Sequence, residues 1–373
     1  MPRLILVNPY SGGSHALWEQ GLARHLPEVP AAEPWTVEVI RLPGRHWKWR
    51  MHAAAWTLVQ RMIEGGMLTQ PVDVFLVTDM LDVAQFRAAL PPSHRTVPIA
   101  LYFHENQLTF PEHPERPRME WDRHYAFGNL MSALMADAVW FNSAYHRSVF
   151  LEAIPGFLKQ LPSPRPVQPA LRIDQKSRVL PIGLEDDVFA EPDRNWFGSG
   201  APVIAWNHRW EHDKGPRAFL KLLRQIKSKG ISFRLAMLGQ EFEGRPEAFD
   251  GIQREFESEV VHWGYAESRR EYLELLGSSQ VALVTAHHDF FGISVLESAA
   301  LGLDIVAPGE LAYPDHFPGA WLCERDAMLA ALEQVLRSHS GRDWRGCVER
   351  YRWDEVAKQW DRALRPLVGA SIS

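Results

Sequence analysis

The fold is decided by a stretch in the second half of the chain, which reads Pro202-Val203-Ile204-Ala205-Trp206-Asn207-His208-Arg209-Trp210-Glu211-His212-Asp213-Lys214-Gly215. Its first five residues form a short apolar run, which is typical of a buried strand. Polar and charged residues follow at once. Because open α/β sheets bind ligands beyond the carboxyl ends of their strands, this order predicts a binding loop after a strand of such a sheet.

A second stretch repeats the pattern: the apolar run Val281 to Thr285 precedes His288-Asp289-Phe290-Phe291-Gly292-Ile293-Ser294-Val295-Leu296-Glu297. On the first loop, Arg209 and Lys214 can bracket a diphosphate as it leaves with growing negative charge. Asp289 and Glu297, on either side of a predicted helix start, can bind hydroxyls of a sugar and of a ribose. Together the two stretches predict a pocket for a nucleotide sugar.

Strand-like and helical patterns alternate along the chain, which predicts two βα-repeating parallel sheets. The predicted strands of the first sheet are Leu4 to Asn8, Thr36 to Arg41, Val72 to Thr78, Val97 to Phe103, Ala138 to Asn142 and Arg178 to Ile182, with helices such as Met51 to Ile63 and Asp122 to Met135 between them. The pattern restarts at Pro202 and continues with Phe233 to Leu238, Val260 to Trp263, Val281 to Thr285 and Asp304 to Val306. Linker-like residues at 193–202 place the domain boundary there.

Composition favours an ordinary enzyme of two domains. The 373 residues are 46% hydrophobic and 23% charged, with no bias toward disorder. The two cysteines, Cys323 and Cys347, have no zinc-type spacing, so we expect a reducing, cytoplasmic location and no disulfide framework. The apolar run Leu4 to Val7 is too short for a signal peptide or membrane span. A net charge of -6 argues against broad nonspecific nucleic-acid binding, although a local basic patch can still bind one small RNA.

The spacing of Arg209 and Lys214 and the acid-x7-acid spacing of Asp289 and Glu297 resemble the retaining GT-B glycosyltransferases of the GT4 class. A closer resemblance is to the tRNA-queuosine α-mannosyltransferase family, over roughly residues 3 to 320. It is carried by Tyr10 to His15, Leu42 to Arg50, Tyr102 to Leu108, His208 to Lys214 and His262 to Tyr265. Asp289 departs from the family pattern, in which we expect Glu; the carboxylate is kept but retracted by one methylene.

This resemblance implies an α/β GT-B fold, with two Rossmann-like domains facing a cleft. Residues 1–193 would form the acceptor-side domain and residues 194–345 the nucleotide-sugar domain. In residues 346–373, the helix Trp353 to Leu367 would cross back to the N-terminal domain. The implied reaction moves mannose from GDP-mannose to the cyclopentenediol of queuosine at the wobble position of tRNA(Asp). It implies retention of configuration, front-face attack, no cofactor or metal, no membrane and no obligatory protein partner.

In the N-terminal half, Gly12-Gly13-Ser14-His15 follows the first predicted strand. Glycines there let backbone N–H groups approach a phosphate or sugar closely. Within the family, Gly12 and Gly13 would face the donor diphosphate, and Ser14 and His15 the acceptor. The alternative is an ordinary βα turn.

His104-Glu105-Asn106 ends another predicted strand, Val97 to Phe103. In retaining GT-B enzymes a histidine at this place contacts the transferred sugar. Glu105 would orient His104 or an acceptor hydroxyl, and Asn106 would contact the acceptor. The alternatives are a histidine that caps the next turn and a divalent-metal site shared with His287-His288-Asp289.

The segment Arg45-His46-Trp47-Lys48-Trp49-Arg50 interleaves cations with aromatic rings. That combination binds phosphates and stacks the bases of single-stranded RNA, as an anticodon loop presents them. Arg123, His124, Tyr125 and the run Tyr145-His146-Arg147 are candidate extensions. The alternative is a solvated basic loop whose tryptophans pack on the next helix.

Two further segments lie where GT-B enzymes bind the donor. Trp263, Gly264 and Tyr265 would seat the nucleotide base. Phe291, Gly292, Ile293 and Ser294 open a helix whose free N–H groups would bind phosphate or sugar oxygens. In contrast, Asn142-Ser143 favours a helix cap after a strand.

Three other functions remain open. A GT4 enzyme with a lipid or glycan acceptor would share the donor site, although no amphipathic basic membrane helix is evident. A GT-B sugar-nucleotide epimerase would lack an acceptor channel. A noncatalytic RNA-binding protein would explain the basic aromatic segment, but not Arg209, Lys214, Asp289 and Glu297 together.

Overall fold

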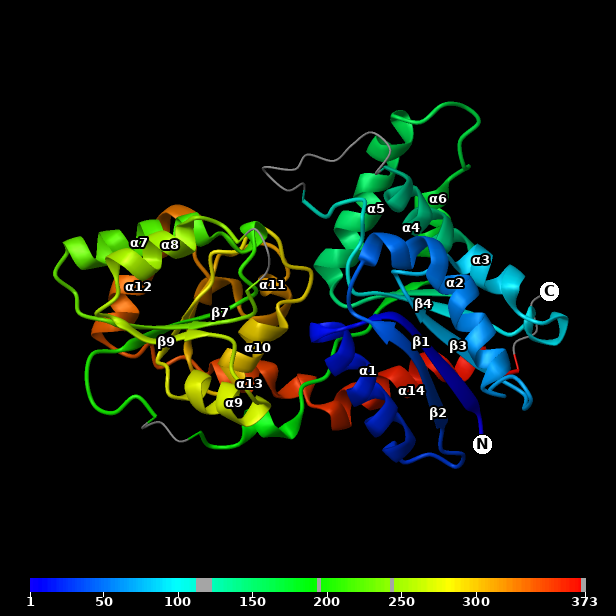
Figure 1. Ribbon diagram of the computed structural model, residues 1–373, viewed down its shortest axis with the longest axis horizontal. Coiled ribbons are helices and arrows are strands. Elements are labelled where there is room, and N and C mark those ends of the chain that lie inside the picture. Colours follow the sequence, from blue (N-terminus) through cyan, green and yellow to red (C-terminus); the bar gives the residue numbers. More distant parts are fainter. Residues whose placement is uncertain (112–122, 193–195, 242–244, 370–373) are drawn as a thin grey trace. The chain divides into compact units, whose positions relative to one another are not determined.

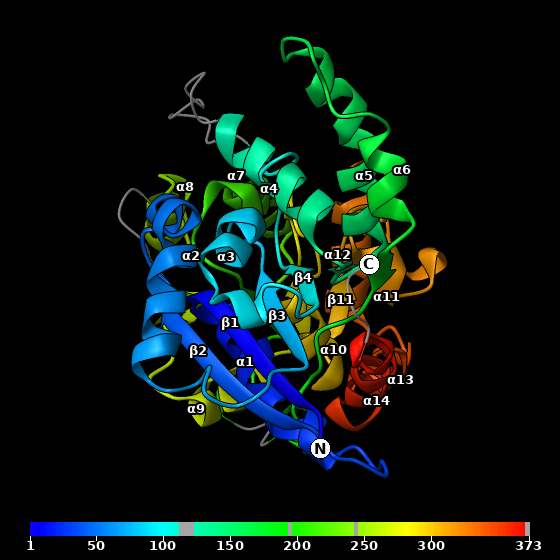
Figure 2. The ribbon, with the colours of Figure 1, turned by 90° about the vertical axis from the view of Figure 1, so that its right-hand side faces the viewer.

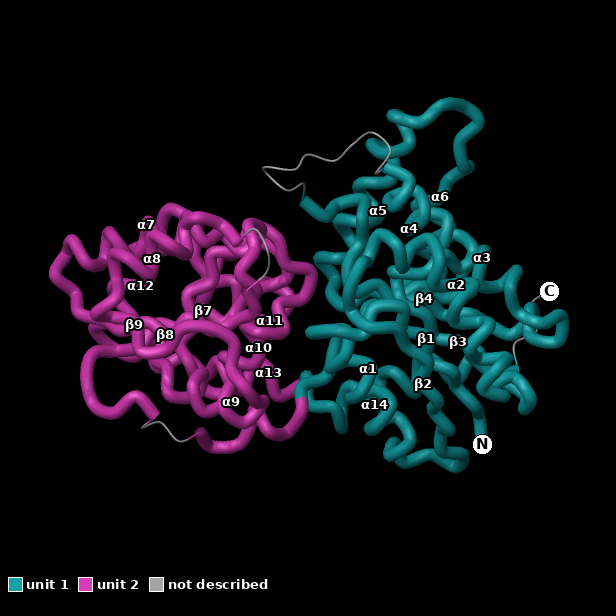
Figure 3. The backbone as a smooth tube through the Cα atoms, viewed as in Figure 1, with its two compact units in different colours: residues 1–112, 117–184, 351–373 teal, residues 113–116, 185–350 magenta. Residues whose placement is uncertain are grey.

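The computed structural model describes residues 1–111, 123–192, 196–241 and 245–369. The described chain forms two compact units, coloured separately in Figure 3: unit 1 holds the residues up to 184 together with those from 351 onward, and unit 2 holds residues 185–350. The chain leaves and re-enters unit 1 at one point, where Leu184 N donates to Tyr351 O and Trp353 N donates to Leu184 O. The two compact units divide at residues 184/185 and 350/351, whereas the predicted bounds were 193/194 and 345/346.

Unit 1 contains one parallel sheet with the strand order β2-β1-β3-β4-β5-β6. Its strands are β1 (Arg3–Ser11), β2 (Thr36–Pro43), β3 (Val74–Thr78), β4 (Ile99–Phe103), β5 (Ala138–Phe141) and β6 (Ser177–Val179). Strand order reverses between β1 and β3. Ligands of open α/β sheets bind at such a reversal, beyond the carboxyl ends of the strands.

Helices cover both faces of this sheet (Figures 1 and 2), and alternate residues of the central strands pack on opposite faces. Phe75, Val77, Leu101 and Phe103 join a buried apolar cluster that also contains residues of α2, α3, α4, α5 and α6. These helices are α2 (Trp47–Glu64), α3 (Val83–Ala89), α4 (Arg123–Met135), α5 (Ala144–Lys159) and α6 (Pro169–Asp174). The side chain of Tyr102 lies on the opposite face of the sheet, where it stacks on Trp18.

The other face of the sheet is covered by α1 (Gly13–His25) and α14 (Trp353–Leu364). Trp18 of α1 stacks on Tyr102 with ring centroids 4.8 Å apart, and Trp360 of α14 lies 4.9 Å from Tyr102. The Trp360 indole also donates to Pro181 O at 3.2 Å. The last helix therefore packs on unit 1 through buried indoles.

Unit 2 contains a second parallel sheet, of order β11-β10-β7-β8-β9. Its strands are β7 (Val203–Asn207), β8 (Arg234–Leu238), β9 (Val260–Gly264), β10 (Val281–Leu283) and β11 (Asp304–Val306). The order reverses between β7 and β10. The loops after these two strands therefore meet at the switch point of the sheet.

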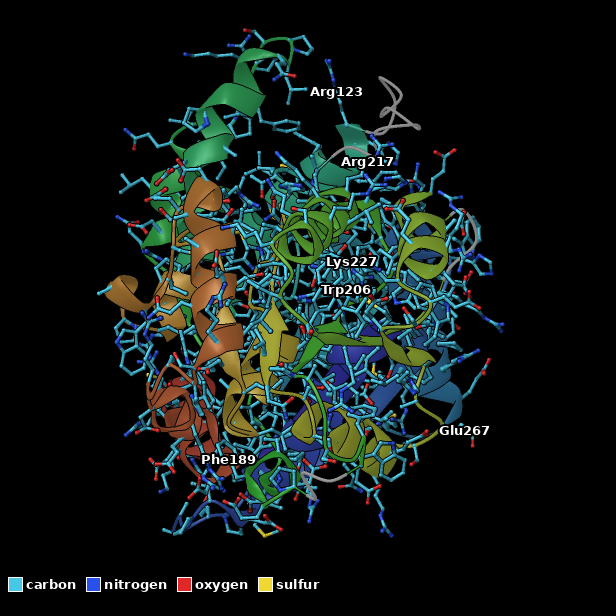
Figure 4. All side chains as sticks on the ribbon, turned by 90° about the vertical axis from the view of Figure 1, so that its left-hand side faces the viewer. Arg123, Phe189, Trp206, Arg217, Lys227 and Glu267 are labelled. Atoms are coloured by element: carbon cyan, nitrogen blue, oxygen red, sulfur yellow. The ribbon has the colours of Figure 1, made fainter. Side chains whose placement is uncertain are left out.

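Figure 1 shows the helices of unit 2 on both sides of its sheet. On one side lie α7 (Pro216–Ser228), α8 (Ala248–Glu255) and α12 (Met328–Arg337), which share an apolar cluster with Trp206, labelled in Figure 4. On the other side lie α9 (Arg269–Gly277), α10 (Ile293–Ala300) and α13 (Trp344–Val348), and the short α11 (Tyr313–His316) follows β11. The α/β class with two parallel sheets is confirmed.

One predicted helix begins earlier than the sequence indicated. We expected it to start at Met51, but α2 starts at Trp47 and its N-cap, His46, has a left-handed backbone with φ 58°. The turn after Pro43 is therefore completed at His46. Trp47 to Arg50 consequently belong to the first turn of a helix instead of a loop.

The predicted helix cap at Asn142-Ser143 is confirmed. Ser143 is the N-cap of α5, and its side chain accepts a hydrogen bond from His146 N at 2.9 Å. Among the described helices, none is both long and apolar enough to cross a membrane.

Candidate active site

The loop after β7 packs against the end of β10 at Gly215. Gly215 has φ 71°, and a Cβ there would lie 2.1 Å from Thr285 O. The Thr285 hydroxyl donates to Lys214 O at 3.1 Å and to Gly215 O at 3.0 Å. A glycine is therefore required for the close approach that brings the two predicted stretches together.

Lys214 lies in a cluster of buried charges that joins the two loops. Its ammonium donates to His288 O at 2.9 Å and pairs with Asp213 at 3.2 Å and Asp289 at 3.8 Å. Burial lowers the pKa of Lys214, but Asp213 and Asp289 outweigh it and the net shift is upward. Lys214 therefore carries a fixed positive charge at the switch point.

The two carboxylates beside Lys214 are held ionised. Burial raises the pKa of Asp289, but Lys214, His208 and His288 lower it by more, so the net shift is downward. For Asp213 burial again raises the pKa, and Lys214 and then Arg209 reverse the sign. The motif around Lys214 indicated no role for Asp213, although Asp213 directly precedes Lys214.

Asp289 is positioned by the residues that open α10. The Tyr313 hydroxyl donates to Asp289 Oδ2 at 3.3 Å. Gly292, the N-cap of α10, has φ 79°, and a Cβ there would lie 3.0 Å from the Tyr313 ring and 3.5 Å from Asp289 Oδ2. The carboxylate that we predicted to bind the sugar thus lies at the N-terminus of a helix, beside Gly292, Ile293 and Ser294.

Two histidines in this cluster are held neutral. Burial, and then the charge of Lys214, lower the pKa of His208 to about 4 and that of His288 to about 4. The Ser294 hydroxyl and His208 Nδ1 are 3.0 Å apart, while His208 Nε2 is buried without a hydrogen-bond partner among the described residues. His208 therefore links the loop after β7 to the start of α10.

Arg209 differs from Lys214 in exposure. Its side chain is 48% exposed and pairs with Glu211 at 3.0 Å. Its charge nevertheless acts on Asp213, His208 and Lys214. The two predicted diphosphate cations therefore lie in one site, one buried and one accessible.

Glu297, which we predicted to bind the ribose, already accepts hydrogen bonds from protein groups at both carboxylate oxygens. Arg269 donates to Oε1 at 2.6 Å, and the Tyr272 hydroxyl donates to Oε2 at 2.7 Å. Arg269 also pairs with Asp187, and Asn207 contacts the Tyr272 hydroxyl at 3.4 Å. A ribose bound to Glu297 would have to share or displace these donors.

The predicted base-binding residues differ in accessibility. Tyr265 is 73% exposed, directly after β9. Trp263 packs on Trp210, with ring centroids 4.9 Å apart. Phe291, predicted at the helix start that binds phosphate or sugar oxygens, is buried beside His316. Gly264 ends β9 with φ 120°. Tyr265 is therefore the most accessible ring of this predicted set.

The unit 1 site is built on His104, at the end of β4. His104 stacks on His15, with ring centroids 4.1 Å apart, and contacts the edges of Trp18 and Tyr102. Burial, followed by His15 and His146, lowers the pKa of His104 well below its usual value. Both of its ring nitrogens are buried without a hydrogen-bond partner among the described residues. A neutral imidazole is thus held by ring packing.

Asp79, which we did not predict as a site residue, accepts a hydrogen bond from the backbone of His104. Its Oδ1 accepts from His104 N at 2.9 Å. Burial, and then the charge of Glu105, raise the pKa of Asp79 well above its usual value. Asp79 follows β3 directly, so the rule that we applied to β4 and β7 would have found it.

Glu105 and Asn106 continue the turn after His104. Glu105 Oε1 accepts from Gln107 Nε2 at 3.0 Å. Asn106 is fully buried, and its Oδ1 accepts from Leu108 N at 3.0 Å and Thr109 N at 2.9 Å. Asn106, predicted as an acceptor contact, is therefore occupied in shaping the turn.

The loops after β1 and β2 meet at two glycines. Gly44 N donates to Ser11 O at 3.0 Å, and a Cβ at Gly44 would lie 2.8 Å from Gly12 Cα. Gly13 is exposed with φ 53°, and Ser14 is partly buried in the first turn of α1. Gly44 thus joins the Gly12-Gly13 loop to the segment Arg45 to Arg50.

The residues described contain no group of three or more His, Cys, Asp or Glu side chains arranged to hold a metal ion. The predicted site residues instead gather around the carboxyl ends of strands, one group in each unit.

Comparisons with known proteins agree with this division. Residues 3–184 match the family model described as tRNA-queuosine alpha-mannosyltransferase N-terminal, and residues 190–313 match the model of glycosyl transferases group 1. A tRNA-queuosine alpha-mannosyltransferase of Drosophila melanogaster is 30% identical over 326 residues, which cover 85% of this chain and 82% of that protein.

Solved structures share the fold of the whole chain. Anabaena HepE, in complex with UDP, has a TM-score of 0.68 and 13% identity over 98% of this chain and 100% of that chain. The trehalose-6-phosphate synthase OtsA has a TM-score of 0.68 and 14% identity, over 98% of this chain and 99% of that chain. Both are GT-B proteins, so the GT-B fold class is confirmed.

Proposed function

Because the chain belongs to the tRNA-queuosine alpha-mannosyltransferase family, we propose that it transfers mannose from GDP-mannose to the cyclopentenediol of queuosine at the wobble position of tRNA(Asp). That the chain is a glycosyltransferase follows from the family and from its group 1 domain. The proposal includes the identity of the donor and of the acceptor. It also includes retention of configuration, action without a cofactor and a cytoplasmic location.

The observation that carries the donor half of the proposal is the Lys214 cluster. Glycosyl transfer passes through an oxocarbenium-like state, and the leaving diphosphate gains negative charge. Lys214 is fixed by Asp213, Asp289 and His288 O, and Arg209 adds an accessible charge beside it. We assign these two cations to the diphosphate. Preorganised charges of this kind cost no reorganisation at the moment of reaction.

The carboxylates of the same unit would orient the donor. Asp289, held ionised beside α10, would accept hydrogen bonds from hydroxyls of the mannose. Glu297 would accept from the ribose, sharing its oxygens with Arg269 and Tyr272. Asp289 would reach one methylene less far than a glutamate, so the sugar has to lie closer to the start of α10.

In unit 1, the neutral His104 would contact the transferred sugar, and Glu105 would orient an acceptor hydroxyl. Because His104 is uncharged, it can exchange hydrogen bonds with the sugar without adding positive charge near an oxocarbenium-like centre. No nucleophilic carboxylate is assigned. The acceptor hydroxyl would attack from the face that the diphosphate leaves, and the departing phosphate would take its proton.

The test incubates the protein with bulk tRNA and labelled GDP-mannose or UDP-galactose, followed by digestion of the RNA to nucleosides. We expect label from GDP-mannose alone, in one modified nucleoside that contains queuosine. Label from UDP-galactose would refute the donor. Release of an epimerised sugar nucleotide without RNA labelling would instead indicate an epimerase, and the absence of both would favour a lipid or glycan acceptor.

A further inference from the structure

Aromatic and cationic side chains gather on unit 1 where α2 runs beside the start of α4. The set, named here the α2–α4 surface, consists of Trp47, Lys48, Trp49, His52, Trp56, His124 and Tyr125.

Two indoles of this surface face solvent. Trp49 and Trp56 are each 63% exposed. They are seven positions apart in the sequence, so they lie on one face of α2, about 10.5 Å apart along the helix axis. In contrast, the largest buried side chains of the chain include Trp18, Trp140 and Trp206. Exposed indoles in register are uncommon on a surface without a partner.

Cations accompany these rings. Lys48 Nζ lies 5.7 Å from the centre of the Trp47 ring and 5.6 Å from that of Tyr125. Burial, and then the like charges of Arg45 and Arg61, lower the pKa of Arg50, in agreement with the basic residues of α2 and of the turn before it. In the sequences of α2 and α4 the one carboxylate is Glu64, at the far end of α2.

A pair of imidazoles ties the two helices together. His52 Nε2 and His124 Nε2 are 3.0 Å apart, and the rings stack with centroids 4.9 Å apart. The His124 ring in turn lies 3.9 Å from Tyr125. These contacts hold the rings of His52, His124 and Tyr125 in fixed positions, which lowers the entropic cost of binding a ligand beside them.

We propose that the α2–α4 surface is the docking site for a single-stranded loop of the tRNA substrate. Unstacked bases would stack on Trp49 and Trp56, and Lys48 with the neighbouring arginines would bind the backbone phosphates. This assignment rests on the proposed tRNA substrate. It extends the recognition residues along α2 to Trp56 and across to His52 and His124, whose rings pack on the buried Tyr125.

Charge favours RNA over the other occupants of an aromatic surface. In a symmetric dimer that pairs this surface with itself, the same cations would lie against Lys48 and Arg50, so like charges would repel. A lipid surface requires a continuous apolar stripe, whereas the exposed His52 lies between the two indoles on α2. Rings interleaved with cations match the alternating bases and phosphates of a single strand.

The position of the surface also fits the site in unit 1. α2 begins three residues after Gly44, whose backbone lies against Gly12 and Ser11. The basic end of α2 therefore adjoins the glycine loop at the switch point of the sheet. RNA bound along α2 would have one end at that loop.

The experiment measures binding of a fluorescent tRNA anticodon stem-loop by anisotropy. We expect Trp49→Ala and Trp56→Ala each to weaken binding about 5- to 150-fold, the loss of one base stack. Lys48→Ala should lower the slope of log affinity against log salt by about 0.7, the loss of one phosphate contact. The matched control is Trp196→Ala, which removes a 48% exposed indole of unit 2 and should leave binding unchanged.

Equal RNA affinity in Trp49→Ala, Trp56→Ala and the control would overturn the docking site, even if the wild-type protein labels queuosine. Loss of self-association in sedimentation, or of binding to anionic phosphatidylserine vesicles, with RNA affinity intact, would assign the surface to a second copy or a membrane instead. If the wild-type protein labels no RNA, the proposed function fails separately. GDP affinity should be unchanged in every variant, because each folds with its donor site intact.

Discussion

Replacement of Lys214 by Met tests the charge cluster of unit 2 most sharply. The methionine keeps much of the side-chain volume but leaves Asp213 and Asp289 buried without their nearest cation. Removing one partner of a buried ion pair costs about 3–5 kcal/mol of unfolding free energy. If Lys214 also stabilises the leaving diphosphate, turnover should fall about 10²- to 10³-fold.

The dependence of this loss on pH separates the charge cluster from simple packing. In the wild type the pKa values of both aspartates are lowered, so their contribution to stability is present above the usual aspartate pKa and is lost as pH falls below it. Without Lys214, burial dominates and raises both pKa values. The folded variant then binds protons that the unfolded chain does not, so its stability decreases as pH rises from 5 to 7.

The assay is urea unfolding of wild type and Lys214→Met at pH 5 and pH 7, with steady-state kinetics on the same samples. The variant should lose more stability at pH 7 than at pH 5. A useful control is Lys358→Met, which removes an exposed lysine paired with Glu355 and should leave unfolding unchanged at both pH values. Equal loss at the two pH values, or turnover within twofold of wild type, would refute the reasoning.

Three other changes test separate parts of the structure. Arg209→Ala should reduce turnover about 10²- to 10³-fold with unfolding unchanged, because its side chain is half exposed; kinetics within twofold of wild type would remove it from the site. Glu297→Gln should weaken competition by free GDP if the carboxylate binds the ribose, and an unchanged inhibition constant would contradict that role. Gly183→Ala should cost about 1–3 kcal/mol in thermal unfolding, because its Cβ would lie 2.3 Å from the Trp353 ring; Gly156→Ala, with open space around it, should not destabilise.

The loops that carry the candidate site residues could be predicted from the sequence, because one rule relates them to the buried strands. Parallel strands buried on both faces read as short apolar runs, and ligand-binding residues follow their carboxyl ends. That reasoning predicted the loops containing Lys214, Asp289 and His104. It would also have found Asp79, had it been applied after β3.

Two features depend on contacts that the sequence does not display. Arg269 reaches Glu297 across 28 positions of the chain, so the engagement of the predicted ribose carboxylate appears only in three dimensions. The early start of α2 depends on the left-handed backbone of His46, an uncommon conformation for a residue other than glycine. Trp47 to Arg50 were therefore predicted as a loop, although they form the first turn of a helix.

The most direct test of the central claim uses two samples of one tRNA(Asp) that differ only at the wobble base, guanine in one and queuosine in the other. Both are incubated with wild-type protein and labelled GDP-mannose, and the label in the RNA is measured. We predict one mannose per queuosine-containing tRNA and none in the guanine form. Equal labelling of the two samples, or no labelling of either, would contradict it.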